Sequence, residues 1–391
     1  MSRDVVVVTG TRAEYGILRS VMERIRSHPE LDLTLVVTGM HLSPQYGHTI
    51  DDVRSDGFEV DRTVDMLLSG DGGAAMAKSL GIGLASMAET IRDLDGDIVL
   101  VLGDRGEALA AGIAAAHQNI PVAHVHGGDA MNGAVIDDSI RHALTKFAHL
   151  HFPGSERSAK RIEQLGEERW RISPAGALAL DEIIEKAYTP PETVRSRCDL
   201  RGTPLLLVIQ HPETTRPDAT AEQMRETMAA VTDFDATVAV VYPNSDAGSQ
   251  GIISVIEEYG VRPEVRTFRN LPREDYLGLL AAADVMVGNS SSAIVEAPSL
   301  GVPAVDIGDR QKGRERADHT VSAPYDGEAI RSAIETCLSP EAKRRAETCD
   351  NPYDFGGAAE IIVERLAGVD IGNRLREKRF VDGFDAGASG S

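Results

Sequence analysis

Residues 98–105 read Ile-Val-Leu-Val-Leu-Gly-Asp-Arg, and this stretch decides the fold. Its five apolar residues predict a buried β-strand, and the charged pair Asp104 and Arg105 follows that strand directly. The same order of apolar run and polar cluster returns at 120–129. Charged side chains that follow buried parallel strands meet at the carboxyl edge of the sheet, where open α/β folds bind their ligands. We therefore predict an α/β protein with an active site at that edge.

Strands and helices alternate along the chain, as they do in parallel sheets with crossover helices. In the first half we predict strands at 5–9, 32–38, 98–102, 122–126 and 149–152, and helices at 14–27, 73–94, 107–118 and 139–147. In the second half we predict strands at 205–209, 237–241, 265–268, 285–287 and 304–306, and helices at 219–231, 248–259, 274–282, from 292, and at 328–337.

This alternation predicts two Rossmann-like domains with a ligand cleft between them. We place the first domain at 1–178 and the second at 179–357. The last helical segment, at about 358–380, is expected to pack back on the first domain. Residues 381–391 are expected to form a flexible tail.

The composition of the 391 residues points away from several protein classes. The net charge is -21 and there is no basic stripe, so a nucleic-acid partner is disfavoured. No apolar run approaches a membrane-spanning length, and the chain enters a strand at Asp4 without a signal-peptide core. The three cysteines have neither metal-ligand nor disulfide spacing. We expect a cytoplasmic protein with no nucleic-acid or membrane partner.

The acidity of the chain has two explanations. Acidic residues are spread along the sequence, and arginine far outnumbers lysine. One explanation is a surface suited to a salt-rich cytoplasm, where a short Debye length screens self-repulsion. The other is an ordinary acidic protein of a mesophile. We favour the first.

Three carboxylates near the predicted edge are candidates for proton transfer: Asp104, Asp129 and Asp137. Their pKa values would be spread by mutual repulsion and by the cations Arg105 and Arg141. Burying ionisable groups this close together is costly unless they are paired or used, so an active site is the simplest explanation. A structural role for Arg141 is an ion pair one helical turn from Asp137 or Asp138, which can coexist with function.

Five histidines between 124 and 151 raise the question of a metal site. His124 and His126 would point to opposite faces of a strand and could not chelate one ion together. His149 and His151 would share a face, but they fall in a short strand after a helix. We therefore predict no metal site and no cofactor.

The turn at 9–14, Thr-Gly-Thr-Arg-Ala-Glu, joins the first predicted strand to the first helix. Backbone amides at the helix start, together with the Arg12 guanidinium, would bind phosphate oxygens. A routine turn with a capping threonine explains these residues equally well.

A second candidate anion site follows the predicted strand 285–287 and consists of Gly288, Asn289, Ser290, Ser291 and Ser292. Its amides and hydroxyls, at the start of a helix, would seat a diphosphate. Glu296, about one turn into that helix, would accept hydrogen bonds from a ribose, and Arg310 would line the same edge. A simple serine helix cap is the alternative.

Two further polar residues, His211 and Asn244, follow the predicted strands 205–209 and 237–241. Both would lie at the same sheet edge. A lone histidine at a strand end is more often a packing residue, so this signal is weak by itself.

Together these motifs resemble the hydrolysing UDP-N-acetylglucosamine 2-epimerase family, whose close relatives act on UDP-N,N'-diacetylbacillosamine-type sugars. The resemblance runs in order from about residue 5 to about residue 320. Its segments are Gly10–Gly16, Gly103–Arg105, His124–Gly128, Ile136–Lys146, Gln210–Pro212, Pro243–Gly248, Gly288–Ser291 and Gly308–Arg314. In this chain His126 and Asp129 stand where many relatives have glutamate.

The resemblance implies a glycosyltransferase-B-like fold that binds a UDP-sugar mostly through the second domain, in a homodimer or homotetramer. It implies catalytic roles for Asp104, Asp129, Asp137, His126, Arg141 and His211. It implies substrate binding by Arg12, Arg105, Asn244, Gly288, Asn289, Ser290, Ser291, Ser292, Glu296 and Arg310.

The implied reaction converts UDP-N-acetylglucosamine and water to N-acetylmannosamine and UDP, for sialic-acid-type sugar biosynthesis. Departure of UDP from C1 would leave positive charge on the ring and make the hydrogen at C2 acidic. Arg12, Arg310 and the serine amides would stabilise the leaving diphosphate. Asp104 or Asp137 would stabilise the positive centre or remove the proton, and water would then add to the resulting glycal.

Other functions remain open at this stage. A hydrolysing epimerase could act on UDP-N,N'-diacetylbacillosamine instead. A non-hydrolysing epimerase would return UDP to C1 and would incorporate no oxygen from water. A retaining glycosyltransferase would need an acceptor, and a nucleotide-sugar sensor would bind without turnover.

Overall fold

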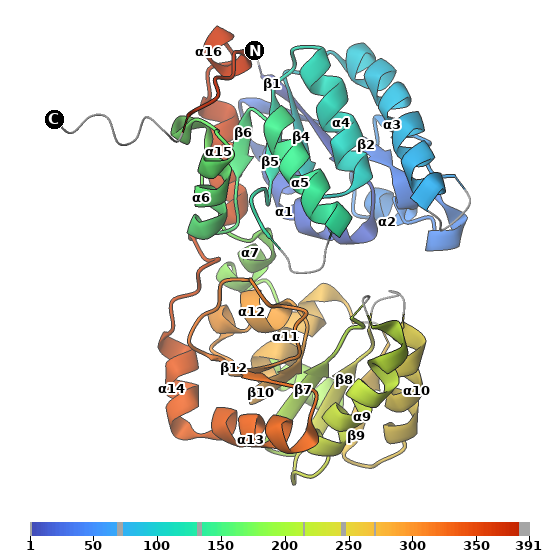
Figure 1. Ribbon diagram of the computed structural model, residues 1–391, viewed down its shortest axis with the longest axis vertical. Helices are drawn as coiled ribbons and strands as arrows, with labels where there is room; N and C mark the ends of the chain where they lie inside the picture. Colours follow the sequence, from blue (N-terminus) through green and yellow to red (C-terminus); the bar gives the residue numbers. More distant parts are fainter. Residues whose placement is uncertain are drawn as a thin grey trace, which may run out of the picture. The chain divides into compact units, whose positions relative to one another are not determined.

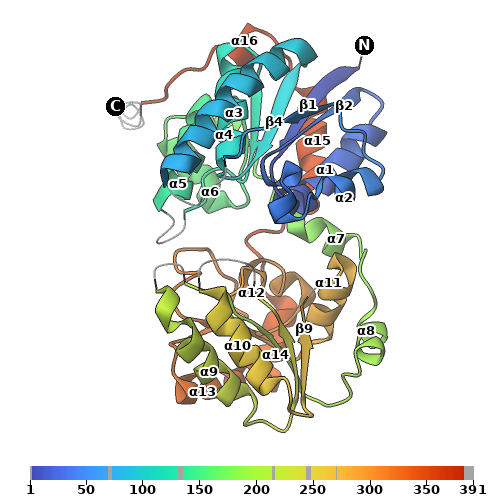
Figure 2. The same ribbon diagram turned by 90° about the vertical axis from the view of Figure 1, so that its right-hand side faces the viewer.

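The computed structural model describes residues 2–68, 73–130, 135–213, 216–243, 248–269 and 271–382. Figures 1 and 2 show these residues as two compact units. The first unit takes the described residues up to Ala130, those from 135 to Asp181 and those from Phe355 onward. The second unit takes the described residues within Glu182–Asp354.

The first unit is built on a parallel sheet of six strands in the order β3-β2-β1-β4-β5-β6. The strands are β1 (Arg3–Thr9), β2 (Leu31–Thr38), β3 (Arg62–Val64), β4 (Ile98–Leu102), β5 (Val122–Val125) and β6 (Leu150–Phe152). The strand β4 is apolar along its whole length, and β1 is apolar from Val5 to Val8, as expected where helices cover both faces of a sheet. The helices are α1 (Arg12–Ser27), α2 (Ile50–Ser55), α3 (Gly73–Leu94), α4 (Gly106–His117), α5 (Val135–Phe147), α6 (Glu156–Gln164), α15 (Ala358–Gly368) and α16 (Asn373–Arg376).

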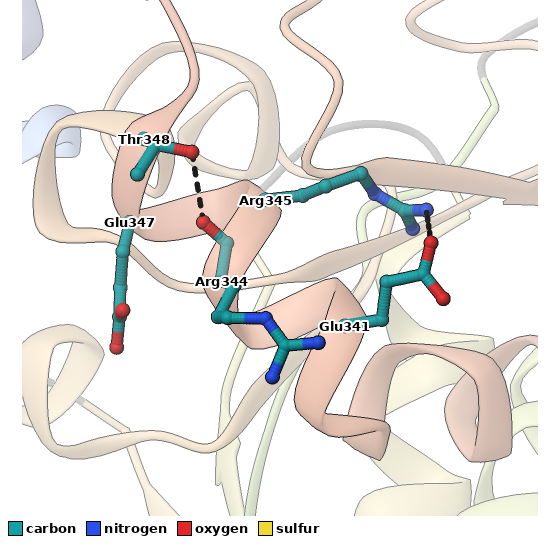
Figure 3. Close-up of a pocket in the computed structure, with 5 residues that line it drawn as sticks. All are labelled: Glu341, Arg344, Arg345, Glu347 and Thr348. Atoms are coloured by element: carbon teal, nitrogen blue, oxygen red, sulfur yellow. Dashed lines mark hydrogen bonds and ion pairs between the residues drawn. The ribbon is translucent and has the colours of Figure 1, made fainter.

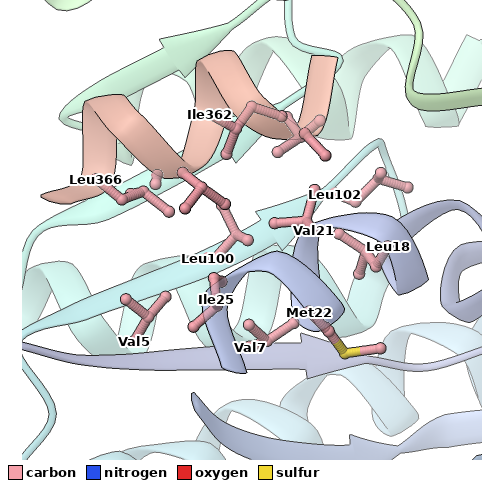
Figure 4. Close-up of a cluster of buried hydrophobic side chains, with 14 of the residues drawn as sticks. Val5, Val7, Leu18, Val21, Met22, Ile25, Leu100, Leu102, Ile362 and Leu366 are labelled. Atoms are coloured by element: carbon pink, nitrogen blue, oxygen red, sulfur yellow. The ribbon is translucent and has the colours of Figure 1, made fainter. Parts of the chain in front are cut away.

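Successive residues of β1 feed two different cores, as the period of a strand requires. Val5 and Val7 pack with α1 and α15, whereas Val6 and Val8 pack with α3 and α4. Figure 4 shows the first of these cores, with Ile362 and Leu366 of α15 beside the side chains of α1 and β4. A helix from the end of the chain thus completes the core that the first residues begin.

Asp181 fixes the start of this late helix. Its carboxylate accepts hydrogen bonds from the backbone N–H groups of Ala358 and Ala359, at 2.7 and 2.9 Å. These are amides of the first turn, which have no acceptor within the helix, so a buried carboxylate is well placed there.

The second unit repeats the architecture with a parallel sheet in the order β12-β11-β10-β7-β8-β9. The strands are β7 (Leu205–Ile209), β8 (Thr237–Val241), β9 (Val265–Phe268), β10 (Val285–Gly288), β11 (Ala304–Ile307) and β12 (Thr320–Ala323). The helices are α8 (Pro191–Arg197), α9 (Thr220–Val231), α10 (Ser249–Tyr259), α11 (Arg273–Ala282), α12 (Ser292–Val295), α13 (Gly327–Leu338) and α14 (Pro340–Thr348). The short helix α7 (Asp181–Ile184) lies at the boundary of the two units.

The predicted fold class is confirmed, since both units are doubly wound parallel sheets. The structure adds the strands β3 and β12, which the sequence pattern did not predict. Both are edge strands of three or four residues, and their exposed positions carry polar side chains that hide the apolar signal. None of the helices in the described part of the chain is long and apolar enough to cross a membrane.

Candidate active site

The strand order of the first unit reverses between β1 and β4, and such a switch point is where open α/β sheets bind ligands. The loop after β4 contains Gly103, Asp104 and Arg105. Gly103 has a φ of 75°, a left-handed conformation that glycine adopts without strain. Its carbonyl oxygen accepts a hydrogen bond from Nε2 of the buried His124, at 2.7 Å. The turn that presents Asp104 is therefore held from the neighbouring strand β5.

Arg141 gathers the acidic residues at this edge. It lies on α5, is almost fully buried, and its guanidinium pairs with the carboxylates of Asp104 and Asp138. The Asp138 contact measures 2.6 Å, and a further bond of 3.1 Å reaches the carbonyl oxygen of Asp129. Segments after β4 and β5 and the first turns of α5 thus meet at one cation. Of the two helical ion pairs considered for Arg141, the structure forms the one with Asp138.

The remaining predicted catalytic residues of this unit differ in their surroundings. The Asp129 carboxylate accepts a hydrogen bond of 2.6 Å from the hydroxyl of Ser158, in the first turn of α6. Asp137 is exposed in the first turn of α5. His126 is partly buried just beyond the end of β5, with a left-handed φ of 59°. Arg12 is exposed at the start of α1 and pairs with Asp52 at 3.6 Å.

Two fully buried histidines of this region, His124 and His151, have partners within the fold. Burial lowers the pKa of His124 to about 3, so its hydrogen bond to Gly103 does not depend on pH in the neutral range. His151 lies 3.3 Å from Glu167, whose carboxylate also contacts Lys146 and Lys378 at 2.5 and 2.8 Å. Among the described residues no group of three or more histidine, cysteine or acidic side chains is placed to hold a metal ion.

The second unit has its switch point between β7 and β10. Gly288 ends β10 with a φ of 137°, and a Cβ there would lie 2.0 Å from the carbonyl oxygen of Ile209, so only glycine fits. The next residue, Asn289, is completely buried. Its amide oxygen accepts from the His211 backbone N–H at 2.7 Å, and its amide nitrogen donates to the His211 carbonyl at 2.9 Å. Asn289 therefore fastens the loop after β7 to the loop after β10.

The loop after β11 joins the same cluster. Arg310 and Gln311 both donate to the carbonyl oxygen of Asn289, at 3.2 and 2.8 Å. The backbone N–H groups of Ser290 and Ser291 donate to no acceptor among the described residues. These N–H groups, the partly exposed Ser291 and the Arg310 guanidinium form a cationic and hydrogen-bond-donating edge. Such an edge suits a phosphate group.

One expectation about this loop is wrong. Glu296 was predicted to lie inside the helix that starts at Ser292, but α12 ends at Val295 and Glu296 follows it. Pro298 lacks the backbone N–H that would continue the helix. The buried Glu296 carboxylate pairs with Arg273 of α11. The predicted substrate-binding residue Asn244 lies outside the described residues.

A shallow hollow elsewhere in the second unit is not a substrate pocket. Figure 3 shows its lining, which consists of Glu341, Arg344, Arg345, Glu347 and Thr348, all from α14. Arg345 pairs with Glu341 at 3.8 Å, and the Thr348 hydroxyl donates to the carbonyl of Arg344. No second element contributes to this lining, so no side chains converge on a ligand there.

Sequence reasoning missed several residues that shape the two edges. Ser158 fixes the Asp129 carboxylate, and Tyr325 donates to Glu213 beside Asn289. These partners come from elements distant in sequence, so no spacing rule identifies them. Glu107 could have been found from the sequence. It follows Arg105 by two residues, and an acidic residue in the first turn of a predicted helix is a common sequence feature.

Comparisons with known proteins agree on one family. The family model described as UDP-N-acetylglucosamine 2-epimerase matches residues 23–367. The chain is 35% identical to the UDP-N,N'-diacetylbacillosamine 2-epimerase (hydrolyzing) of Legionella pneumophila, over 97% of this chain and 99% of that protein. It is 31% identical to a UDP-N-acetylglucosamine 2-epimerase of Neisseria meningitidis serogroup B, over 97% and 98% of the two chains.

The fold is shared with solved structures as well. A crystal structure of UDP-GlcNAc 2-epimerase from Neisseria meningitidis bound to UDP-GlcNAc superposes with a TM-score of 0.76 at 17% identity, covering 93% of this chain and 99% of that one. This likeness shows that the chain shares the fold of that protein. The chain belongs to the UDP-N-acetylglucosamine 2-epimerase family.

Proposed function

We propose that this protein is a hydrolysing UDP-sugar 2-epimerase, which releases UDP and a free 2-epimerised sugar. The observation that carries the proposal is the position of Arg141, which gathers Asp104, Asp138 and the backbone of Asp129 at the switch point of the first sheet. The identity to a relative whose name includes a hydrolysing activity supports the reaction type.

The chemistry assigned to the first unit is proton transfer and charge stabilisation. Loss of UDP from C1 makes the sugar ring cationic, which acidifies the hydrogen at C2. We assign Asp104 to stabilise that centre or remove the proton, since Arg141 holds its carboxylate while a quarter of the side chain stays exposed. The exposed Asp137 is the second candidate base. Asp129 and His126 are assigned supporting roles near Asp104 and Asp137, and Arg105 follows Asp104 directly in the chain.

The chemistry assigned to the second unit is diphosphate binding. The N–H groups of Ser290 and Ser291 and the guanidinium of Arg310 would stabilise the leaving UDP, with Arg12 of the first unit as a further cation. His211, fastened by Asn289, is assigned to contact the substrate from the end of β7.

For the substrate we favour UDP-N,N'-diacetylbacillosamine, because the relative named for that sugar is 35% identical. UDP-N-acetylglucosamine is the second candidate, since the relative named for it is 31% identical over the same share of the chain. The two sugars differ at C4 and C6. The choice therefore depends on side chains around the sugar rather than on the diphosphate loops.

The test is incubation of the purified protein with each UDP-sugar in water enriched in heavy oxygen. A hydrolysing epimerase releases UDP without an acceptor and places the label at C1 of a free sugar with inverted C2. Label-free interconversion of two UDP-sugars would instead identify a non-hydrolysing epimerase. Tight UDP-sugar binding with no product would identify a sensor. A comparison of kcat/KM for the two substrates assigns the sugar.

We also propose that the protein acts in the cytoplasm as a homo-oligomer. The three described cysteines are free, which suits a reducing compartment. The helix α3 exposes Met76 and Ile82, apolar side chains of a kind that self-association covers. The molar mass in solution, measured by light scattering, tests the oligomer: a monomer at micromolar concentration would contradict it.

A further inference from the structure

Two buried glutamates lie at the switch point of the first sheet, beside the residues assigned to catalysis. Glu14 is in the first turn of α1 and Glu107 in the first turn of α4, the helices that follow β1 and β4. Both residues are less than 8% exposed, at 7% and 4%. The proposed mechanism uses neither carboxyl group, so their burial together needs another explanation.

The Glu107 side chain is enclosed by backbone. A Cβ built on Gly10 would lie 2.8 Å from Glu107 Cγ, and one built on Gly39 would lie 2.6 Å from Glu107 Oε1. Gly10 and Gly39 follow the neighbouring strands β1 and β2. The glycines therefore leave space that the Glu107 side chain fills, which fixes where its carboxylate points.

The cation that faces Glu107 is Arg105. Arg105 Nε lies 3.6 Å from Glu107 Oε2, and the Arg105 side chain is 40% exposed. The guanidinium is thus held along one side while part of it stays open at the carboxyl edge next to Asp104. An arginine tethered in this way loses less conformational entropy when it binds an anion.

Glu14 is bound to the loop that leads into its own helix, α1. The Gly10 N–H donates to its carboxyl group at 2.9 Å, and the Thr11 hydroxyl accepts from the Glu14 N–H at 3.2 Å. Burial, and then the nearby charge of Glu107, raises the pKa of Glu14 to about 7. Both first turns favour negative charge, but one arginine faces two buried carboxyl groups.

Within the described part of the chain, His41 and Arg12 are further titratable groups on elements next to Glu14, and neither adds a second positive charge to the pair at neutral pH. His41, in the segment after β2, bonds the Thr9 hydroxyl at 3.2 Å, and burial lowers its pKa below the ordinary value, so it is mostly uncharged at pH 7. Arg12, on the same helix as Glu14, is exposed and pairs with Asp52.

We infer that Glu107 is a positioning residue for Arg105 and that Glu14 carries the proton which lets a single arginine neutralise the pair. With Glu14 protonated, the Glu107 carboxylate holds Arg105 at the edge where the substrate binds. When Glu14 ionises, two carboxylates compete for Arg105 and its alignment weakens. The assignment of Arg105 to the substrate rests on the proposed function, whereas the proton on Glu14 does not.

The first test is a double-mutant cycle on kcat/KM for UDP-sugar hydrolysis. Arg105→Gln and Glu107→Gln are each expected to lower kcat/KM by roughly tenfold or more, and the double variant by no more than the larger single effect. The loss is expected in kcat/KM while the melting temperature of Glu107→Gln stays close to wild type. Wild-type kcat/KM in Glu107→Gln, or additive losses in the double variant, would overturn the positioning role.

The second test is the pH profile. Wild-type kcat/KM is expected to fall as pH rises above about 7, following the ionisation of Glu14. Glu14→Gln mimics the protonated carboxyl, so the variant should keep wild-type kcat/KM at pH 6 and lose much of the alkaline fall. Glu23→Gln, at an exposed position on the same helix, is the matched control and should retain the wild-type profile. An unchanged alkaline fall in Glu14→Gln would refute the assignment of the proton.

A third measurement separates this inference from the proposed function. If no UDP-sugar is turned over, the proposed function fails, yet the proton can still be followed in the unfolding of wild type and Glu14→Gln by urea. The stability difference between them is expected to change between pH 5 and pH 8. A difference that is constant with pH would show that Glu14 carries no such proton, whether or not the protein turns over a UDP-sugar.

Discussion

The two units share one strand order but carry different chemistry at their carboxyl edges. Read from β3 and from β9, both sheets run through their third, second, first, fourth, fifth and sixth strands. At the first switch point the chain places buried charges, with Arg141 among carboxylates. At the second it places a buried amide, Asn289, that fastens two loops. One backbone plan thus supports two kinds of site.

The difference follows from what each edge must hold fixed. Charged groups in a poorly solvated place must be paired, so the first edge fixes its acids through an arginine. The amide clamp is itself neutral, and the nearby N–H groups of Ser290 and Ser291 donate to no acceptor among the described residues, which suits an anionic ligand. We therefore expect substitutions in the first unit to act on the chemical step, and substitutions in the second to act on nucleotide binding.

The largest expected effect that tests this division is at Asp104. Asp104→Asn keeps the shape of the side chain but removes the charge that Arg141 holds, so kcat should fall on the order of a thousandfold. The Kd for UDP, measured by calorimetry, should stay within about twofold. Asp93→Asn, an exposed aspartate paired with Arg92 on α3, is the matched control and should change neither quantity. A wild-type kcat in Asp104→Asn would show that Asp104 at the first edge does not take part in the chemical step.

The second prediction concerns the amide clamp. Asn289→Ala leaves the backbone N–H and carbonyl of His211 without their partner, and each such loss costs about 1–3 kcal/mol. The loops after β7 and β10 should then shift, and the Kd for UDP should rise on the order of tenfold to a hundredfold. The kcat at saturating substrate should change less than about threefold. A loss of kcat with unchanged UDP affinity would reverse the roles of the two units.

Much of the fold follows from local pattern. The strands β4 and β7 are unbroken apolar runs of five residues, and helical stretches follow them, so a parallel sheet could be predicted from residues alone. The edge strands β3 and β12 could not be predicted, because three or four half-exposed residues carry too little periodicity in hydrophobicity.

Only part of the candidate site could be predicted from the sequence. Residues at strand ends, such as Asp104 and His211, could be placed at an edge because parallel strands all end there. Their partners could not, since the bonds from Ser158 to Asp129 and from Gln311 to Asn289 depend on loop geometry. Glu296 was misplaced because the effect of a proline two residues later on a short helix was overlooked.

The third prediction uses the pH dependence of stability at the first edge. The pKa of Glu14 is about 7 in the folded chain against 4.5 for the free side chain, so the folded state binds the extra proton between these values. Its contribution to stability is full below pH 4.5 and is lost as pH rises through 7. Relative to Glu14→Gln, wild type should lose about 2 kcal/mol of unfolding free energy between pH 5 and pH 8. If wild type and Glu14→Gln lose the same unfolding free energy over this range, or wild type loses less, Glu14 carries no such proton.

The smallest expected effect concerns His124, which touches neither substrate nor base in the proposed mechanism. Its Nε2–H holds the carbonyl of Gly103, and its pKa of about 3 keeps it neutral. His124→Phe fills the space without the donor, so kcat should fall roughly tenfold while UDP affinity is retained. His124→Gln can donate again and should recover most of that loss. Because His124 does not titrate near neutral pH, neither variant should move the acidic limb of the pH profile. A shifted limb would make His124 a proton-transfer group, and the first edge would then work through a histidine as well as through its carboxylates.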